Sequence, residues 1–360
     1  MKTVLVSVSN DLTFDQRVQK VCNTLHKNGF TIHVIGREQK NSNPSQFDYK
    51  VELIQPIFNK GFLFYIEFNI RLFFKILVTK KDILLANDLD TLLPNQMVSR
   101  LQSKKLVFDS HELFSEIPEL VDRPFIKSIW KRLENSLIPK QQYGITVSSK
   151  IADVYKELYH VNFSTIKNYP NADVNSNSKV DNPFGKESKS IILYQGALNL
   201  GRGLELIIDT MEYVSDCKLV LIGDGDIRHD LEKRVIEKKL QNQIEFTGKI
   251  HPKKLKNITP FASIGISLEE DLGLNYRFAM PNKIFDYIQA GVPILISDLP
   301  EMKSVIDNYE VGELVKSRNP EELAFQIQSI LQKDFSAGLK KAGKKLIWEN
   351  QEKELLRIFQ

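Results

Sequence analysis

Short apolar segments of strand length alternate with segments of helical period along the chain, and the alternation restarts after a polar interruption. Parallel strands need a crossover connection, so this alternation predicts parallel sheets with helices on both faces. The interruption, residues 168–190, is rich in Asn, Ser, Pro and Lys and has no apolar period, which is typical of a linker. The sequence therefore predicts an α/β protein with two doubly wound, Rossmann-like domains that face one another across a cleft.

The expected domains are 1–170 and 190–345, joined by a linker over 171–189, and a C-terminal helix over 346–360 packs back on the first domain. In open α/β sheets ligands bind beyond the carboxyl ends of the strands, so the residues that follow each strand are the candidates for chemistry. We expect strands at residues 3–8, 31–36, 51–55, 83–86, 106–109, 144–147, 191–195, 218–222, 244–247, 264–267 and 293–297.

Composition narrows the class of protein. Hydrophobic residues make up 42% and charged residues 26%, which is typical of a globular protein. The net charge of +4 is too diffuse to indicate nucleic acid as a partner. The two cysteines, Cys22 and Cys217, exclude a disulfide framework, and the first residues contain no export signal. We therefore expect a cytoplasmic location.

Residues 62–78 are mostly apolar and approach the length of a membrane span. Glu67, Arg71 and Lys75 recur at every fourth position, so they form one charged stripe on a helix and make insertion across a bilayer costly. The segment is predicted to be an amphipathic helix that either packs on a sheet or lies on a membrane surface. Flanking lysines and a second basic cluster at 340–345 favour an anionic membrane surface as a partner.

The sequence lacks the motifs of several enzyme classes. The sequence has no P-loop, no Gly-x-Ser-x-Gly elbow, no glycine in the first strand-to-helix turn at 7–11, and no metal-ligand spacing among its six histidines. The two Asp-x-Asp sequences, 88–90 and 224–226, have the oxygen ligands that Mg²⁺ prefers. At strand ends Asp more often serves turns and helix caps, so we favour a structural role for both and expect no metal.

The second half contains a more specific pattern. After the strand at 191–195 comes Gly196-Ala-Leu-Asn-Leu-Gly-Arg202-Gly203, followed by a helix. Glycines let a backbone approach a ligand, a helix start attracts phosphate, and arginine can grip phosphate with two donors. Lys283 lies in the first turn of another helix, where a cation opposes the helix dipole. A bound anion explains that position as well as a surface lysine does.

This ordered set of motifs resembles the retaining glycosyltransferases of family 4, whose two Rossmann-like domains form the arrangement called GT-B. The resemblance covers essentially the whole chain. The matching segments are 15–18, 87–92 and 107–112 in the first domain, and 194–196, 201–203, 221–225, 246–248 and 281–293 in the second.

The resemblance implies a role for particular residues. Arg202 and Lys283 would stabilise the donor diphosphate, and His111 would face the reacting sugar. The acceptor or cleft side of the first domain would include Asn10, Asp15, Arg17 and Glu112. The implied donor-binding residues are Gly196, Arg202, Gly203, Gly223, Phe246, Gly248, Ile250, Lys283 and Asp286, with Asp286 on the ribose.

The chain also departs from the family pattern. Phe278 stands where the first of two glutamates is usual, and Ala197 stands where the first diphosphate arginine is usual. Glu269 and Glu270 are nearby but out of register, so no catalytic role is assigned to them.

The resemblance implies a retaining, metal-independent glycosyltransferase that needs no cofactor and acts in cell-surface polysaccharide or glycolipid synthesis. Its donor would be a nucleotide-diphosphate sugar, with a UDP-sugar favoured, and its acceptor a glycan or lipid-linked glycan. It would be cytoplasmic or peripheral on the inner face of the cell membrane. The alternatives are an impaired scaffold subunit that binds nucleotide sugars and a nucleotide-sugar epimerase of related fold.

Overall fold

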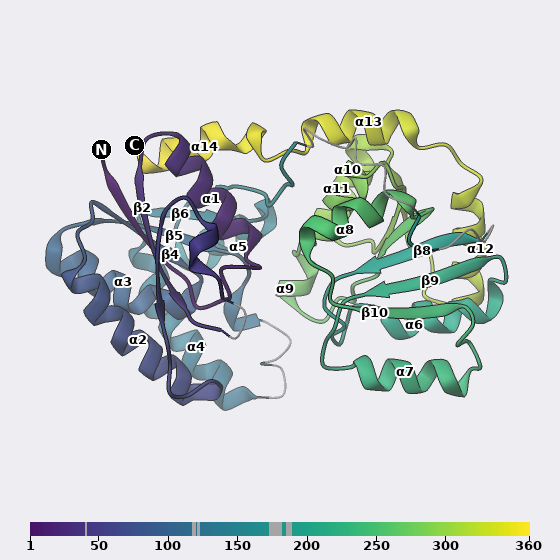
Figure 1. Ribbon diagram of the computed structural model, residues 1–360, viewed down its shortest axis with the longest axis horizontal. Helices are drawn as coiled ribbons and strands as arrows, with labels where there is room; N and C mark the ends of the chain where they lie inside the picture. The colour runs from purple at the N-terminus through teal and green to yellow at the C-terminus, as the bar shows by residue number, and fades with distance from the viewer. Residues whose placement is uncertain (40–41, 117–119, 121–122, 173–181, 185–188) are drawn as a thin grey trace. The chain divides into compact units, whose positions relative to one another are not determined.

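The computed structural model describes residues 1–360 except 40–41, 117–119, 121–122, 173–181 and 185–188. The chain forms two compact units: residues 1–168 with 351–360, and residues 169–350. Each unit has one parallel sheet covered by helices (Figure 1). The predicted class, two parallel α/β domains, is confirmed. Most of the expected linker 171–189 lies outside the described residues.

The first unit is built on a seven-stranded sheet of order β3-β2-β1-β4-β5-β6-β7. All its strand pairs are parallel. Its strands are β1 (Thr3–Ser7), β2 (Thr31–Arg37), β3 (Lys50–Ile54), β4 (Ile83–Asn87), β5 (Lys105–Ser110), β6 (Tyr143–Thr146) and β7 (Ser164–Thr165).

Helices cover both faces of this sheet, because central strands such as β4 are buried at every residue and present apolar side chains to each side. The helices are α1 (Gln16–Lys27), α2 (Gly61–Val78), α3 (Leu89–Gln102), α4 (Pro124–Leu137), α5 (Ser149–Tyr159) and, from residue 351, α14 (Glu349–Phe359).

The second unit is built on a six-stranded parallel sheet of order β10-β9-β8-β11-β12-β13. Successive residues of its first strand point to opposite faces: Ile192 and Tyr194 enter one apolar core, and Ile191 and Leu193 enter the other. The strands are β8 (Ser190–Gln195), β9 (Cys217–Ile222), β10 (Ile244–Gly248), β11 (Ile264–Ser267), β12 (Ile294–Ile296) and β13 (Gly312–Leu314).

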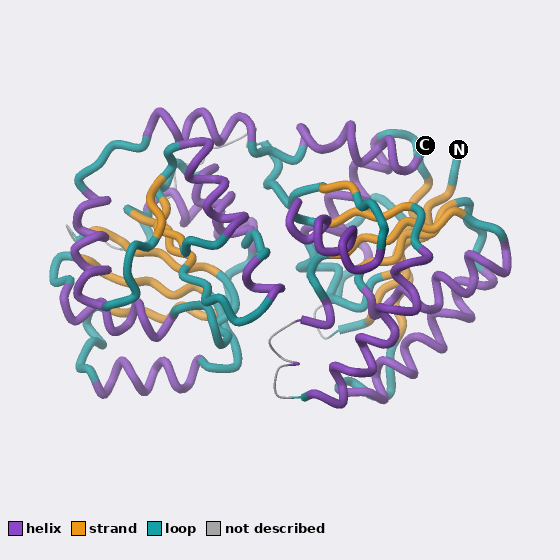
Figure 2. Tube along the Cα trace, turned by 180° about the vertical axis from the view of Figure 1, so that it is seen from behind, coloured by secondary structure: helices purple, strands orange, loops and turns teal. Residues whose placement is uncertain are grey.

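Helices flank this sheet, as the tube view shows (Figure 2), and most of them follow a strand along the chain. They are α6 (Leu204–Thr210), α7 (Arg228–Glu237), α8 (Pro252–Ile258), α9 (Leu274–Arg277), α10 (Asn282–Gln289), α11 (Pro300–Tyr309), α12 (Pro320–Leu331) and α13 (Ser336–Lys345).

Each sheet contains a point where the strand order reverses. It lies between β1 and β4 in the first unit and between β8 and β11 in the second. Loops leave such a point in opposite directions, which leaves room for a ligand at the carboxyl ends of the strands. Every expected strand is present within one residue at each end, while β7 and β13 were not expected. Within the described residues, no helix combines the length and apolarity that crossing a bilayer requires.

Candidate functional site

Three charged side chains meet beyond β8 and β11 in the second unit. Glu269, two residues after β11, has no exposed side-chain surface. Its Oε1 lies 2.9 Å from Nζ of Lys283 and 3.4 Å from Nη1 of Arg202, and its Oε2 accepts a 2.6 Å hydrogen bond from Ser267 Oγ. The two basic residues expected to hold a diphosphate therefore lie on one carboxylate.

Two tyrosine rings support these cations. The Arg202 guanidinium lies 4.9 Å from the ring centre of Tyr276, and Nζ of Lys283 lies 4.0 Å from that of Tyr194. Both hydroxyls also donate to carbonyls of the loop before α6, at residues 197 and 200. The loop and its arginine are thus braced by side chains from three other segments.

The charges in this network do not cancel. Burial alone would raise the pKa of Glu269, but Lys283 and Arg202 outweigh it and lower the pKa, so Glu269 is ionised. Two cations and one anion leave one net positive charge. The Nε of Arg202 is buried and makes no hydrogen bond in the described part of the chain. A buried donor without a partner is costly, and an anionic ligand would satisfy it.

The backbones of three expected donor-binding glycines come together at the neighbouring strand ends. Gly223 has a φ of +149°, and a Cβ built there would lie 1.8 Å from the carbonyl oxygen of Gly196. The N–H of Gly223 donates to the carbonyl of Gly248 at 3.0 Å. Phe246 lies on the same strand as Gly248, and Ile250 follows it; both are half-buried. Only glycine permits the close approach at residue 223.

Asp286 lies on α10, three residues after Lys283, and is half-buried. Its Oδ2 accepts a 3.1 Å hydrogen bond from Nε2 of Gln195, the last residue of β8. Oε1 of Gln195 in turn accepts from Thr259 Oγ1 at 3.0 Å. The carboxylate expected on the ribose is therefore held at the end of the same strand that leads into the Arg202 loop.

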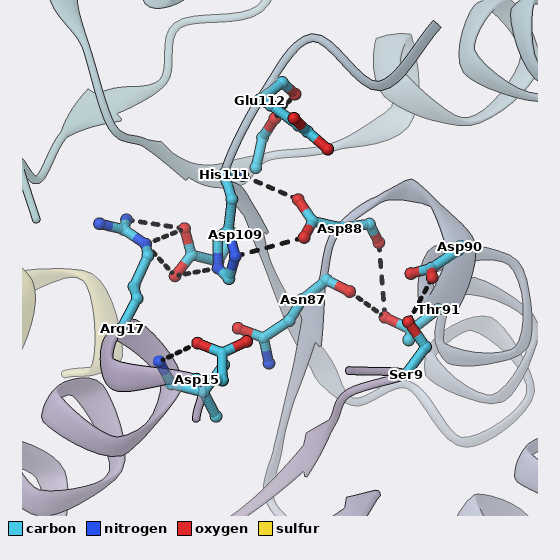
Figure 3. Close-up of polar contacts among 12 residues, drawn as sticks. Ser9, Asp15, Arg17, Asn87, Asp88, Asp90, Thr91, Asp109, His111 and Glu112 are labelled. Atoms are coloured by element: carbon cyan, nitrogen blue, oxygen red, sulfur yellow. Dashed lines mark hydrogen bonds and ion pairs between the residues drawn. The ribbon is translucent and has the colours of Figure 1, made fainter. Parts of the chain in front are cut away.

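A second cluster lies at the carboxyl ends of β4 and β5 in the first unit, where His111 is flanked by two aspartates (Figure 3). Nδ1 of His111 lies 3.2 Å from Asp88 Oδ2, and Nε2 lies 3.5 Å from Asp109 Oδ2. The backbone N–H of His111 also donates to Asp88 at 2.8 Å. Asp88 reaches this position with a φ of +57°, a conformation that costs an L-residue about 1–3 kcal/mol.

The two carboxylates decide the charge of the imidazole. Burial alone would lower the pKa of His111, but Asp88 and Asp109 outweigh it and raise the pKa to about 10. Asp109 keeps a lowered pKa, because Arg17 and His111 outweigh its burial. Burial raises the pKa of Asp88 to about 7. At neutral pH the histidine therefore carries a proton on both ring nitrogens.

Two of the four residues expected on the acceptor side, Arg17 and Asp15, stabilise elements of the first unit. Arg17 is buried, forms a two-pronged ion pair with Asp109 and donates from Nη1 to the carbonyl of residue 166 at 2.6 Å. Asp15 accepts from the N–H of residue 18 at 3.0 Å and caps α1. Asn10 is exposed, and Glu112, next to His111, is half-buried (Figure 3).

Three of the four aspartates of the two Asp-x-Asp sequences have other partners. Asp88 contacts His111, Asp90 accepts from Ser9, and Asp224 accepts from the N–H of residue 225. Across the described residues, no three His, Cys, Asp or Glu side chains lie close enough to hold a metal ion together.

Two residues central to these clusters had no assigned role in the sequence. The spacing of Glu269 does not match the family pattern, and Asp109 belongs to a matching segment in which the resemblance implies no role for it. The available signal was position: Glu269 follows β11, which borders the reversal of strand order, and Asp109 lies near the end of β5, one strand further from the reversal.

A model of one protein family matches part of this chain. Residues 177–346 match the family model described as Glycosyl transferases group 1. The matched stretch, just under half of the chain, is similar to the domains of that family. It contains the Arg202, Glu269 and Lys283 network and most of the second unit.

A curated relative of this chain is an uncharacterised glycosyltransferase of Methanocaldococcus jannaschii, which is 24% identical over 185 residues. That alignment covers 48% of this chain and 45% of the archaeal protein, so the chain spans less than half the length of this relative.

Solved structures similar to the whole chain show its fold. A sucrose-phosphate synthase from Thermosynechococcus elongatus has a TM-score of 0.80 at 16% identity, covering 100% of this chain and 98% of that one. Anabaena HepE in complex with UDP and glucose has a TM-score of 0.80 at 14% identity, covering 100% and 99%. The arrangement of elements around the matched stretch is therefore that of GT-B proteins.

Proposed function

We propose that this protein is a retaining glycosyltransferase that moves a sugar from a nucleotide-diphosphate donor to an acceptor hydroxyl. The observation that carries the proposal is the convergence of Arg202 and Lys283 on buried Glu269 inside the stretch that matches the Glycosyl transferases group 1 model. The network keeps one net positive charge and one buried N–H that has no partner among the described residues. Both features favour a diphosphate ligand.

Transfer breaks the bond between C1 of the sugar and the diphosphate oxygen, so negative charge grows on the leaving group. Arg202 and Lys283 stabilise this charge, and preorganised stabilisation of this kind is usually the largest catalytic contribution. In a front-face reaction the leaving phosphate takes the proton from the acceptor hydroxyl as the new C1–O bond forms. This route requires neither a metal ion nor a separate general base, and the configuration at C1 is retained.

We assign His111 to the reacting sugar. Its Nε2 is buried, lies 3.5 Å from Asp109 Oδ2 and makes no hydrogen bond to the described residues, and we assign this atom to a sugar hydroxyl. Asp88 and Asp109 keep the imidazole protonated, so Nε2 would donate rather than accept. Asp109, held by Arg17, acts as a positioning residue for the ring.

We favour UDP as the nucleotide. HepE, which shares the fold, is described in complex with UDP and glucose. In this chain, the segment that includes Phe246, Gly248 and Ile250 would contact the base, Asp286 the ribose, and Gly196, Gly203 and Gly223 would let the backbone approach the phosphates. No cofactor is needed in this scheme.

The acceptor in this proposal is a glycan or a lipid-linked glycan, and the pathway is the synthesis of cell-surface polysaccharide or glycolipid. Asn10 and Glu112 are the residues we assign to the acceptor, while Asp15 and Arg17 position the elements around them. A lipid-linked acceptor implies a cytoplasmic enzyme that works at the inner face of the cell membrane, against an anionic surface.

A thermal-shift panel of UDP, GDP, ADP, CMP and dTDP tests the donor, because a ligand that binds only the folded state raises Tm. Incubation with the matching nucleotide sugars then tests the reaction. Slow release of nucleoside diphosphate with free sugar supports a transferase. Isomerised sugar would show an epimerase, and binding without turnover would show a scaffold subunit.

A further inference from the structure

Helix α2 is apolar on two opposite sides. One side is buried in the first unit and consists of Phe64, Phe68, Leu72 and Ile76. The exposed side should then carry charge, as on most helices that cover a sheet. Instead every residue of α2 classed as exposed is apolar or Gly61: Phe62, Leu63, Ile66, Ile70, Phe74 and Val78, with exposed fractions between 40% and 82%.

The neighbouring helix continues this surface. α3 lies beside α2 on the same face of the sheet (Figures 1 and 2). Its Leu93, Met97 and Leu101 recur every fourth residue and are 37–67% exposed. We call these nine side chains the apolar outer face. On α2 it runs from residue 62 to residue 78, about 24 Å at the rise of an α-helix. Contiguous apolar surfaces of this extent mark sites of interaction.

The charged residues of α2 are turned away from this face. Glu67 accepts from the backbone N–H groups of residues 57 and 58 and pairs with Arg71 at 2.7 Å. Lys75 pairs with Glu52 on β3 at 3.2 Å. The Glu67 side chain is 13% exposed, whereas those of Arg71 and Lys75 are 41% and 40% exposed. The stripe of charges that makes α2 too polar to cross a bilayer thus binds the helix to its own unit, and its two exposed members are cations.

The charges at the borders of the apolar outer face are positive. Lys60 and Lys80 flank the two ends of α2, and Arg100 lies near the end of α3; all three are exposed. The only acidic residues of the two helices are Glu67, engaged as described, and Asp90, which is buried and accepts from Ser9. An uncharged centre with a basic border complements an anionic lipid surface, where apolar side chains enter the acyl boundary and cations meet the headgroups.

We propose that the apolar outer face docks this protein on an anionic lipid bilayer, with α2 lying in the plane of the interface. This deepens the proposed function, on which it rests for its biological reason, because it names the surface that would bring the enzyme to a lipid-linked acceptor. Attachment here combines apolar insertion with attraction to anionic lipid. Salt should therefore weaken the binding without abolishing it.

Co-sedimentation with vesicles of phosphatidylcholine, with and without phosphatidylglycerol, tests the proposal. The double variant Ile70→Glu/Phe74→Glu should partition at least roughly tenfold less to anionic vesicles, because it places two charges where apolar side chains insert. Leu158→Glu is the matched control: Leu158 on α5 and Ile70 are both 55% exposed. An equal loss in the control, or no loss in the double variant, would overturn the proposal.

Two further measurements distinguish insertion into lipid from self-association of the protein. The emission of Phe74→Trp should shift to shorter wavelength with anionic vesicles; an unchanged spectrum contradicts insertion. Sedimentation velocity without lipid tests whether the face joins two copies of this chain, and a dimer that Ile70→Glu dissociates and that binds no vesicles would replace the proposal. Thermal shift with UDP on the same variants separates a failure of the docking proposal from a failure of the proposed function. Retained UDP binding without vesicle binding rejects only the docking face.

Discussion

Lys283 holds its ammonium group 2.9 Å from the carboxylate of Glu269, a side chain with no exposed surface. The lysine stands in the first turn of α10, where the helix dipole disfavours a cation. Glu269 accounts for that position, because it supplies a negative charge of the chain's own. A diphosphate would then enter a site whose cations are already aligned.

Glu269→Gln should lower the free energy of unfolding by roughly 3–5 kcal/mol, because it leaves the buried ammonium of Lys283 without its counter-charge. Diphosphate can supply the missing charge. The rise in Tm on adding inorganic diphosphate should therefore be larger for this variant than for the wild type. An equal or smaller rise would place the diphosphate away from Glu269.

Arg202→Ala and Lys283→Ala should each weaken UDP binding by about 10- to 150-fold, the equivalent of roughly 1.5–3 kcal/mol for a hydrogen bond between charged groups. Isothermal titration measures the effect. Arg234→Ala is a suitable control, because Arg234 pairs with Asp209 and lies outside the residues assigned to the donor. Unchanged affinity and turnover in the double variant would contradict the assignment of both residues.

Asp286→Asn should reduce affinity for UDP more than for inorganic diphosphate, because only UDP brings ribose hydroxyls to the carboxylate. Comparing the two dissociation constants in wild type and variant isolates this contact. The amide keeps the shape of the side chain and can still bond Gln195. Equal losses for both ligands would mean that Asp286 only supports the end of β8.

The contribution of His111 to stability should depend on pH. Its pKa of about 10 in the folded protein lies above the ordinary value of 6.5, so the ionised imidazole stabilises the fold fully below about pH 6.5. This contribution is lost as the pH rises toward about 10. Urea unfolding of wild type and His111→Gln should thus show a larger difference near pH 7 than near pH 10. A difference independent of pH would mean that the imidazole is uncharged.

His111→Gln should also lower turnover while leaving UDP binding nearly intact.

Gly223→Ala should destabilise the protein and abolish UDP binding, because the added Cβ would lie 1.8 Å from the carbonyl oxygen of Gly196. Gly291→Ala is the matched control: it also has a positive φ, +71°, but its Cβ would meet nothing within 4 Å. We expect the control to cost only about 1 kcal/mol of backbone strain. Similar Tm values for the two variants would show that the backbone at residue 223 can move aside.

The sequence was sufficient for the sheets because buried parallel strands leave a strong signal. The strand Ile264–Ser267 was predicted at its observed limits, and the others differ by one residue at most. Ser164–Thr165 and Gly312–Leu314 were missed because two or three residues are too few to show a period. Glu269 was missed for another reason: motif spacing counts along the chain, whereas the lysine and arginine reach this carboxylate through space.

Contacts through space also decide which residues of α2 are buried. Its sequence predicted an amphipathic helix but allowed either packing or exposure of the apolar residues. The structure shows that the alternatives belong to different faces: Phe68 is buried and Phe74 is 60% exposed. A helix with two apolar faces has a weak overall periodicity, so only the tertiary fold shows which face remains free.

The path of the chain affects the order in which the protein can fold during synthesis. The first unit includes residues 351–360, whose Phe359 is fully buried and contacts Phe30, and whose Gln360 carbonyl accepts from Lys2. These residues leave the ribosome only after the entire second unit has been made. The first unit therefore lacks residues 351–360 while the second unit is synthesised and can fold. A nascent chain stalled before residue 351 would expose to chaperones the edge that these residues complete.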